Sequence, residues 1–389
     1  MAKIRMGMVG GGEGAFIGAV HRIAAAIDGD IELVCGAFAS SPERSTRSGA
    51  ALHLPTQRVY PDYQGMLAAE AALPASERMQ FVSIVTPNHL HFPVAAAALR
   101  AGFHVLSDKP ATVDLDQALA LRDLLRETGL LYGLTHTYAG YPLIKEARTR
   151  IAAGELGAIR KLVVEYPQGW LAEREEDTDN KQAAWRVDPA RAGPSGCMGD
   201  IGVHAAHLAE YVSGLRISQL CADLGTFVEG RHLDDDGAML LRFENGARGV
   251  LWASQVCVGE ENALAIRVYG ERGGLEWRQQ EPNTLWLKWN DRPTEMLRAG
   301  ASYLDARSNL HSRTPMGHPE GYLEAFANLY RSFAQQIRLH EGAEGVDPGY
   351  GECPGIEAAI RGMAFIELAV AAGASDAKWH AFEDVSGGN

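Results

Sequence analysis

The first third of the chain alternates short, continuous apolar runs with segments whose apolar residues recur at helical spacing. The continuous runs are bounded by turn residues and predict buried strands at residues 4–9, 31–38, 81–85, 104–106 and 130–134. Helical spacing is clearest over residues 19–27, 94–99 and 115–128. Strands that alternate with helices in this way predict a doubly wound parallel sheet.

The pattern changes near residues 135–141, where we place a domain boundary. A helix over 141–156 and an alternating strand over 159–166 are followed by a long polar segment at 168–198. Strand-like runs separated by turn residues then predict an antiparallel meander from residue 217 to 289. Residues 291–315 show no clear period. The remaining predictions are helices over 318–339 and 354–372 and a frayed tail at 386–389.

A glycine-rich turn joins the first predicted strand to the first helix. Backbone N–H groups of such a turn can approach a pyrophosphate, and the following helix N-terminus attracts its negative charge. This context indicates a dinucleotide-binding (Rossmann) domain and makes five residues candidates for cofactor binding: Gly10, Gly12, Gly14, Phe16 and Ile17. Ala15 occupies the sixth position of the fingerprint, and Gly18 indicates a longer turn. A glycine-rich loop alone also fits a hairpin.

Two further strand ends are expected to contact the cofactor. The second strand is normally followed by an acid that binds the ribose, but here Ser40, Ser41 and Arg44 follow it. Two hydroxyls and a guanidinium suit a 2′-phosphate, which tilts the choice between NAD and NADP slightly toward NADP. The alternative is that Arg44 is a solvated helix residue. Thr86 and Asn88 follow the third strand, on the edge that faces the ligand.

Lys109 stands at the end of the fourth predicted strand, before Pro110, and is biased toward an extended backbone. If it faces the cofactor, its ammonium can hold a substrate hydroxyl and stabilise a developing alkoxide. The alternative is an ordinary surface lysine. His89 and His91 lie nearby without an acid or cysteine at metal-ligand spacing, so we predict no metal site.

An acid and a base stand four residues apart in the middle of the chain. Asp200 and His204 lie in a predicted helix, where this spacing places both on one face. An imidazole beside a carboxylate keeps a defined tautomer and can accept a proton near neutral pH. The alternative is an acid favoured by the helix dipole and an ordinary histidine.

The polar segment at 168–198 leads directly into this pair. Long loops in compact domains are usually functional or disordered, and we interpret this one as a wall of the substrate site. Trp170 and Trp185 could stack on a substrate ring, and Arg186 could donate hydrogen bonds to hydroxyls or to a carboxylate. Simple packing of both tryptophans is the alternative.

Composition excludes several classes of protein. The 389 residues carry a formal net charge of -13, which disfavours nucleic acid as a partner. The five cysteines are scattered without a Cys-x-x-Cys pair, which favours a reducing compartment over a disulfide framework or a zinc site. With no secretory leader and no apolar run of membrane-spanning length, we expect a cytoplasmic protein without a membrane partner.

Four motifs, in this order, resemble the Gfo/Idh/MocA oxidoreductases, a family named for glucose–fructose oxidoreductase and inositol dehydrogenase. They are the glycine turn with residues 17–21, the stretch at 86–89, the tripeptide at 108–110 and the stretch at 199–204. The resemblance covers essentially the whole chain. It implies an α/β protein with an N-terminal Rossmann domain, residues 1–137. It also implies a C-terminal α/β domain, residues 138–389, with a large, mostly antiparallel sheet.

The resemblance also implies site residues. The lysine of the family's Glu-Lys-Pro motif falls on Lys109, with Asp108 in place of the glutamate. The family's Asp-x-x-x-His pair falls on Asp200 and His204, and His207 stands where many members have an aspartate. Two segments that line the family's site add further substrate candidates, Tyr138 and more weakly His318.

The expected activity is that of an NAD(P)-dependent dehydrogenase that oxidises a hydroxyl of a sugar, inositol or related polyol. His204 is the expected base, Lys109 the alkoxide stabiliser and Asp200 the orienting acid, although Lys109 could itself be the base. Redox-neutral glycoside cleavage through transient oxidation and a non-catalytic cofactor sensor are the alternatives. We also expect a homodimer or homotetramer through the open face of the C-terminal sheet. The apolar residues expected on that face are Trp252, Val256, Ile266 and Trp277.

Overall fold

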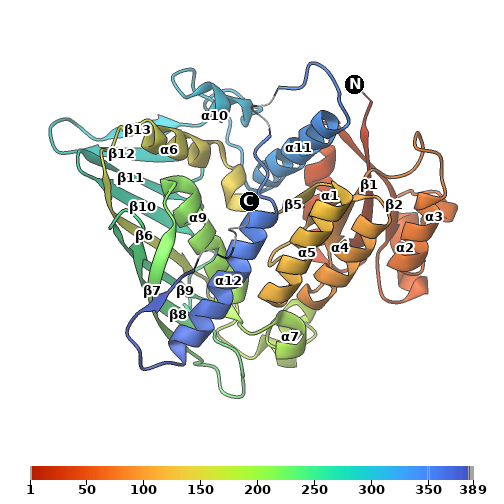
Figure 1. Cartoon of the computed structure of the whole chain (residues 1–389), viewed down its shortest axis with the longest axis horizontal. Coiled ribbons are helices and arrows are strands. Elements are labelled where there is room, and N and C mark those ends of the chain that lie inside the picture. Colours follow the sequence, from red (N-terminus) through yellow and green to blue (C-terminus); the bar gives the residue numbers. More distant parts are fainter. Residues whose placement is uncertain (1, 348, 350, 384, 386–389) are drawn as a thin grey trace. The chain divides into compact units, whose positions relative to one another are not determined.

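The computed structural model describes residues 2–347, 349, 351–383 and 385, and the chain divides into two compact units (Figure 1). One unit comprises residues 1–137 and 322–359, and the other residues 138–321 and 360–389. The sequence-based prediction places residues 322–359 in the C-terminal domain, whereas this division groups them with the first unit. The tail predicted to fray, residues 386–389, lies outside the described residues.

A parallel sheet of five strands forms the first unit, in the order β2-β1-β3-β4-β5. Its strands are continuous apolar runs because side chains pack on both faces, and every residue of β3 is buried. The elements of this unit are β1 (Ile4–Gly10), α1 (Phe16–Ala26), β2 (Ile31–Ala37), α2 (Pro42–Ala51), η1 (Thr56–Arg58), α3 (Tyr63–Ala71), β3 (Phe81–Val85), η2 (Asn88–Leu90), α4 (His91–Arg100), β4 (His104–Ser107), α5 (Leu115–Thr128), β5 (Tyr132–Leu134) and α11 (Tyr322–His340).

The strand order of this sheet reverses at β1, which lies between β2 and β3. Ligands of doubly wound sheets bind at such a switch point, outside the carboxyl ends of the strands. The glycine turn at residues 10–14 follows β1 here, and Thr86 follows β3. At the outer edge of β2, Gly36 forms one isolated parallel bridge with Val59, and no sixth strand of the described sheet forms there.

Two apolar layers complete the core of the first unit. On one side of the sheet, Phe326 and Phe333 of α11 pack with Phe81, and the rings of Phe81 and Phe333 are 5.5 Å apart. On the other side, Val94 of α4 packs with Val82 of β3. A helix that is distant in sequence therefore covers one face of the nucleotide-binding sheet.

The second unit contains a nine-stranded sheet in the order β13-β12-β11-β10-β6-β9-β8-β7-β14. Only β6 and β9 pair in parallel within the described sheet, which confirms the prediction of a large, mostly antiparallel sheet. The elements of this unit are α6 (Pro142–Ala152), β6 (Ile159–Pro167), η4 (Glu175–Asp177), α7 (Lys181–Arg186), α8 (Pro189–Ala192), η5 (Met198–Gly202), α9 (Val203–Ser213), β7 (Ile217–Gly225), β8 (Asp236–Phe243), β9 (Arg248–Ser254), β10 (Ala265–Gly270), β11 (Gly273–Arg278), β12 (Thr284–Trp289), β13 (Glu295–Arg298), α10 (Ala306–Leu310) and β14 (His380–Ala381). Two elements cross between the units, η3 (Thr137–Gly140) and α12 (Ile356–Gly373).

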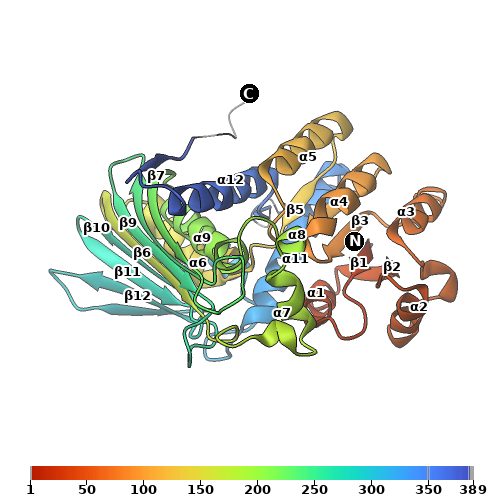
Figure 2. The same cartoon turned by 90° about the horizontal axis from the view of Figure 1, so that it is seen from below.

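Helices α6 and α9 pack on one face of the nine-stranded sheet (Figure 2). Ile266 and Trp277 are paired across β10 and β11 and are fully buried, with the Trp277 ring 5.2 Å from that of Tyr141. The prediction that Ile266 and Trp277 lie on the open face is therefore wrong, because the register turns both toward the helices. Trp252 is half-buried, and its indole N–H donates to Glu165 at 3.3 Å.

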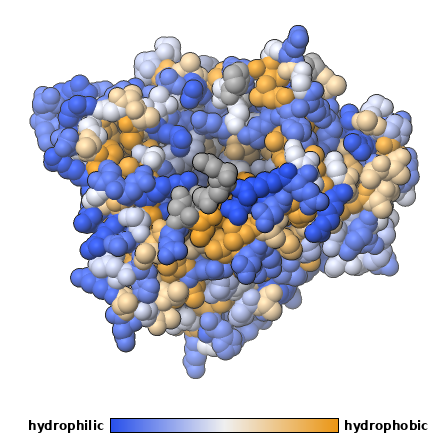
Figure 3. All heavy atoms as spheres, in the orientation of Figure 1, coloured by the Kyte–Doolittle hydropathy of each residue, from blue (hydrophilic) through white to orange (hydrophobic). Residues whose placement is uncertain are grey.

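Two short elements, β13 and α10, lie within residues 291–315, where no period is visible in the sequence. The segment that carries Asp200 is also more irregular than predicted, because it is a π-helical turn, η5, that leads into α9. The face seen in Figure 3 is mostly hydrophilic, with smaller apolar areas. None of the described helices combines the length and apolar character that a membrane span requires.

Candidate active site

The glycine turn after β1 holds the start of α1 close to the strand. Gly10 and Gly14 have φ values of 84° and 79°, a left-handed conformation that other residues rarely adopt. A Cβ on Gly18 would lie 2.3 Å from the Gly11 Cα, so only glycine permits this packing of helix on turn. Gly12 donates its N–H at 3.1 Å to a carbonyl just beyond β2. The glycine turn is thus held both to the start of α1 and to the segment that follows β2.

The N-terminus of α1 fits the pyrophosphate of a dinucleotide. Its N-cap residue, Ala15, makes no side-chain hydrogen bond, and the first turn, with exposed Phe16 and half-buried Ile17, carries no acid. At the end of β3, the Thr86 hydroxyl is buried and has no hydrogen-bond partner among the described residues, and Asn88 is buried at the start of η2. An uncapped helix and an orphaned hydroxyl at the sheet's switch point suit a bound dinucleotide.

The segment after β2 carries both signs of charge. Ser41 caps α2 by accepting the Arg44 N–H at 3.4 Å, and it donates its hydroxyl to the Glu43 carboxylate at 2.6 Å. This hydrogen bond lowers the pKa of Glu43. Arg44 reaches back to the Glu13 carbonyl of the glycine turn at 3.2 Å, and Ser40 is exposed. Ser41 therefore has a structural role, and a carboxylate stands beside the predicted 2′-phosphate site.

The backbone of Lys109 is held by the acid that precedes it. The Asp108 carboxylate accepts the Lys109 N–H and the Thr135 hydroxyl, both at 2.9 Å. Its other oxygen lies 3.8 Å from His21 Nε2, and His21 Nδ1 is 2.7 Å from the Tyr330 hydroxyl. Burial lowers the pKa of His21 to about 4, more than the Asp108 charge raises it, so this imidazole is neutral at pH 7.

His91 connects the ends of two neighbouring strands. Its ring nitrogens lie 2.8 Å from the Thr86 carbonyl, after β3, and 2.7 Å from the Pro110 carbonyl, after β4. Burial lowers the pKa of His91, opposed by Asp108 and by both carbonyls. From the sequence, His91 is considered only as a possible metal ligand. In the structure it contacts the Pro110 carbonyl and so holds the segment that follows Lys109.

In the second unit, Asp200 is the centre of a polar cluster. It lies in η5 and is half-buried, and its Oδ2 accepts Arg186 Nε at 3.1 Å and Gln255 Nε2 at 2.9 Å. Two donors on one oxygen fix the orientation of the carboxylate, and the arginine stabilises its charge. Asp200 is therefore held by specific side-chain donors, and a favourable helix dipole alone does not account for its setting.

His204 is buried on the first turn of α9 among aromatic rings. The Tyr138 ring is 4.9 Å away in a T-shaped arrangement, and the Tyr166 ring is 6.4 Å away. The hydroxyls of these tyrosines share a short hydrogen bond, and Tyr166 also donates to Asn262 at 2.7 Å. Burial raises the pKa of Tyr138, so its hydroxyl keeps its proton at neutral pH.

The two tryptophans of the polar segment lie beside Arg186. The guanidinium carbon is 4.3 Å from the Trp185 ring centre and 5.8 Å from that of Trp170. The Trp170 indole N–H donates to Gln168 at 3.0 Å, and Gln168 donates to Asn262 at 2.7 Å. One connected cluster thus joins Trp170, Trp185 and Arg186 to the Asp200 carboxylate and to the tyrosines around His204.

Two predicted substrate residues make other contacts. His207 stacks on Tyr211, with ring centres 5.7 Å apart, and Arg148 lies over the same tyrosine. Burial, with a smaller contribution from Arg148, lowers the pKa of His207 to about 3. His318 is exposed, and its ring contacts the Pro315 carbonyl at 3.3 Å.

Comparison with known proteins assigns both parts of the chain. Residues 4–136 match the oxidoreductase family with an NAD-binding Rossmann fold, and residues 144–276 match the GFO/IDH/MocA C-terminal domain. An uncharacterized oxidoreductase of Bacillus subtilis is 33% identical over 383 residues, 98% of this chain and 97% of the relative. The chain belongs to the Gfo/Idh/MocA oxidoreductase family. The family, the fold class and the oxidoreductase assignment predicted from the sequence are confirmed.

Relatives of this Gfo/Idh/MocA protein include sugar and inositol dehydrogenases. An inositol dehydrogenase homolog from Azotobacter vinelandii, complexed with NAD+, is 37% identical with a TM-score of 0.92, and 97% of each chain is covered. The inositol dehydrogenase homolog from the same organism in complex with NADH and myo-inositol gives 36% identity, a TM-score of 0.90 and the same coverage. Levoglucosan dehydrogenase of Pseudarthrobacter phenanthrenivorans is 26% identical over 73% of this chain and 76% of the relative.

Three residues of the Asp200 cluster were not singled out from the sequence, although Gln168 begins the polar segment predicted to form a wall of the site. Gln255 directly follows β9, Asn262 precedes β10, and Gln168 follows β6. A polar amide directly beyond an apolar strand is the signal that could have found Gln255 and Gln168, because side chains on loops at strand ends commonly bind ligands. Asn262 carries no such signal, since it lies in the segment before β10.

Proposed function

We propose that this protein is an NAD-dependent dehydrogenase that oxidises a secondary hydroxyl of an uncharged sugar, inositol or related polyol. One observation carries the proposal: Asp200 and His204 lie in a cluster of aromatic, amide and guanidinium side chains within the second unit. Amides and tyrosine hydroxyls both donate and accept hydrogen bonds, as polyol hydroxyls do, and aromatic faces suit sugar rings.

In this proposal His204 accepts the hydroxyl proton as the carbinol carbon is oxidised. Asp200, oriented by Arg186 and Gln255, in turn orients the imidazole. Lys109 donates to the substrate oxygen and stabilises its developing negative charge. When bound, the nicotinamide supplies the hydride acceptor. Lys109 remains the alternative base.

The charge balance around Asp200 supports an uncharged substrate. The Arg186 guanidinium, which could otherwise bind a phosphate or carboxylate, is paired with Asp200 at 3.1 Å. The neighbouring donors and acceptors are Gln255, Gln168 and Asn262, which carry no charge. A sugar phosphate would have to displace this pairing, whereas a cyclitol or free sugar would not.

We expect NADH to bind at least about 10-fold more tightly than NADPH, because the Glu43 carboxylate repels a 2′-phosphate. Fluorescence titration with each nucleotide measures the two dissociation constants. Arg44→Ala is expected to leave the NADH constant unchanged, and Arg47→Ala is the matched control on the same helix. Tighter NADPH binding that Arg44→Ala abolishes would instead support Ser40, Ser41 and Arg44 as a phosphate site.

The activity is tested by absorbance at the nicotinamide band with NAD, against inositols, free sugars, glycosides and sugar phosphates. Accumulation of NADH with an uncharged polyol is the expected result. Product release from a glycoside without NADH accumulation would favour redox-neutral cleavage. Cofactor binding without any turnover would favour a sensor. The cytoplasmic location predicted from composition stays a prediction.

We further propose a homodimer through the face of the nine-stranded sheet opposite α6 and α9. Leu240, Val250 and Val163 are cross-strand neighbours in the central strands, and Leu240 is 46% exposed. A contiguous apolar row on an exposed sheet indicates an interface. Leu240→Arg is expected to convert the dimer into monomers of 42.0 kDa in light scattering, whereas Met316→Arg, at an exposed site elsewhere, should not. A wild-type monomer would contradict the proposal.

A further inference from the structure

The loop at residues 226–235, between β7 and β8, contains a buried arginine, Arg231, most of whose side-chain hydrogen bonds go to residues outside the loop. The Arg231 side chain is 2% exposed. Its Nε and Nη2 atoms bind the two oxygens of Glu176 at 3.0 and 2.9 Å. Its remaining N–H groups donate to the carbonyls of Leu171 and Glu173, both at 2.7 Å, and toward Asp235 at 3.5 Å. All five donors of this guanidinium are therefore used.

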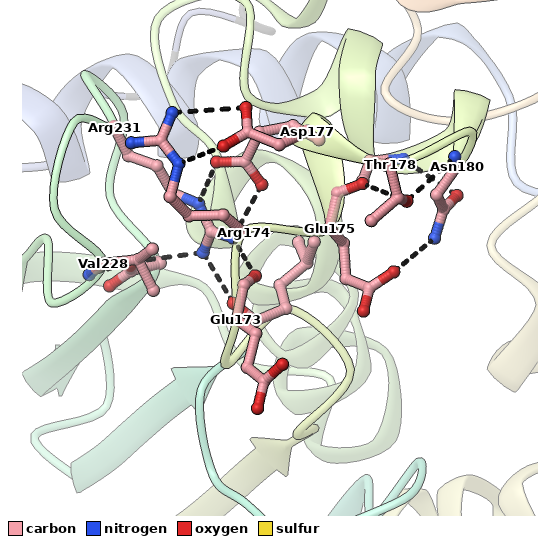
Figure 4. Close-up of polar contacts among 12 residues, drawn as sticks. Glu173, Arg174, Glu175, Asp177, Thr178, Asn180, Val228 and Arg231 are labelled. Carbon is pink, nitrogen blue, oxygen red and sulfur yellow. Dashed lines mark hydrogen bonds and ion pairs between the residues drawn. The ribbon is translucent and has the colours of Figure 1, made fainter.

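The partners of Arg231 outside its own loop lie on the polar segment 168–198, which also contains Trp170 and Trp185. Figure 4 shows Arg231 and Arg174 among the acidic residues of this segment. Arg174 is also bonded there, to Asp177 at 2.6 Å and to the Glu229 carbonyl at 2.8 Å, but its side chain is 48% exposed. Exposed ion pairs contribute little, whereas a buried bidentate pair with two carbonyls fixes the backbone.

The other end of the same loop holds the start of η5. The Asp234 carboxylate accepts the Ser195 hydroxyl at 2.7 Å and the N–H groups of Gly196 and Met198 at 2.9 and 2.8 Å. Its backbone carbonyl accepts the Cys197 N–H at 2.8 Å. Asp234 thus accepts four hydrogen bonds from residues 195–198, and these set the position of the chain immediately before Asp200.

We propose that Arg231 and Asp234 are positioning residues for the substrate site and that loop 226–235 is a clasp. Arg231 fixes residues 171–176, between Trp170 and the helix α7 that carries Arg186, and Asp234 fixes the segment of Asp200. The clasp joins the part that contacts the substrate ring to the part that orients the base. This inference rests on the dehydrogenase activity proposed above, but the hold of the clasp on residues 168–198 can be measured by proteolysis without turnover.

The two ends of the clasp are expected to have different kinetic signatures. Arg231→Met frees the wall of the site and should raise KM for the polyol about 10-fold with a smaller change in kcat. Asp234→Asn places an amide N–H against backbone N–H donors and shifts Asp200, so kcat should fall about 100-fold with a smaller change in KM. Arg231→Lys should not rescue, because one ammonium cannot reach a carboxylate and two carbonyls in one plane.

Arg174→Met is the matched control, since it removes an exposed arginine from the same segment, and its kinetics should stay within about twofold of wild type. Chymotrypsin cleavage within residues 168–198 supplies a readout independent of activity, and it should accelerate in Arg231→Met but not in Arg174→Met. Equal cleavage rates in the two variants would overturn the clasp. If Arg231→Met and Asp234→Asn keep the KM and kcat of wild type and only their melting temperatures fall, both residues have a purely structural role. A wild-type protein without turnover but with the expected cleavage pattern would refute only the dehydrogenase proposal.

Discussion

Lys109→Ala is expected to lower kcat by about 10³-fold while the NADH dissociation constant changes by less than about threefold. The ammonium is proposed to act on the substrate oxygen, where charge develops only as the reaction proceeds, so its loss should affect kcat far more than cofactor affinity. Stopped-flow oxidation of the polyol and NADH titration give the two numbers. Lys3→Ala, at an exposed site of the same unit, is the control and should match wild type.

A companion variant separates the two candidate bases. If His204 takes the proton, His204→Asn should lower kcat by about 10²-fold or more and remove the acidic limb of the kcat/KM profile against pH. Lys109→Arg, which keeps the positive charge, should then retain that limb. An acidic limb that survives in His204→Asn but disappears in Lys109→Arg would identify Lys109 as the base. Near-normal turnover in both Lys109→Ala and His204→Asn would refute the proposed catalytic set.

Gly18→Ala is expected to weaken NADH binding at least about 10-fold and to destabilise the first unit by about 3 kcal/mol. The new Cβ would lie 2.3 Å from the Gly11 Cα and 2.4 Å from its carbonyl oxygen, and both are backbone atoms that no rotamer change can move away. Helix and turn would have to separate. The hydrogen bond from Arg22 to the Gly11 carbonyl would be strained with them.

The matched control for this variant is Gly14→Ala in the same turn. A Cβ there meets open space, although φ is +79°, so only backbone strain of about 1 kcal/mol is expected. Thermal unfolding and NADH titration distinguish the two cases. If Gly18→Ala binds NADH as tightly as Gly14→Ala does, the close contact of helix and turn is not what organises the cofactor site.

Periodicity alone located most of the regular structure. The runs at residues 81–85 and 115–128 coincide with β3 and α5, because continuous apolar runs and helical spacing reflect burial directly. It missed β13, where Glu295 and Met296 are exposed, since a short edge strand with one buried residue has little pattern. It could not assign the faces of the nine-stranded sheet, because these depend on the register between strands.

The acid and base could be proposed from their spacing, but their setting could not. Gln255 and Asp234 act on the Asp200 segment from strands and loops that are distant in sequence. The pairing of β8 with β9 brings these two residues near each other, and the predicted meander contains that pairing. Their contact with the Asp200 segment joins parts of the chain that are distant in sequence, so no local pattern predicts it. The π-helical turn at Asp200 likewise follows from hydrogen bonds to Asp234 as well as from the residues of the turn.

The position of α11 in the first unit has a consequence for biosynthesis. Strand β5 ends at Leu134, but the helix that covers one face of the same sheet begins at Tyr322. During translation, Phe81 and its neighbours on that face therefore emerge from the ribosome long before Phe326 and Phe333 can cover them. The nucleotide-binding unit can complete its core only after most of the other unit has been made. The nascent chain thus exposes an apolar sheet face, a kind of surface prone to aggregation, until synthesis is nearly finished.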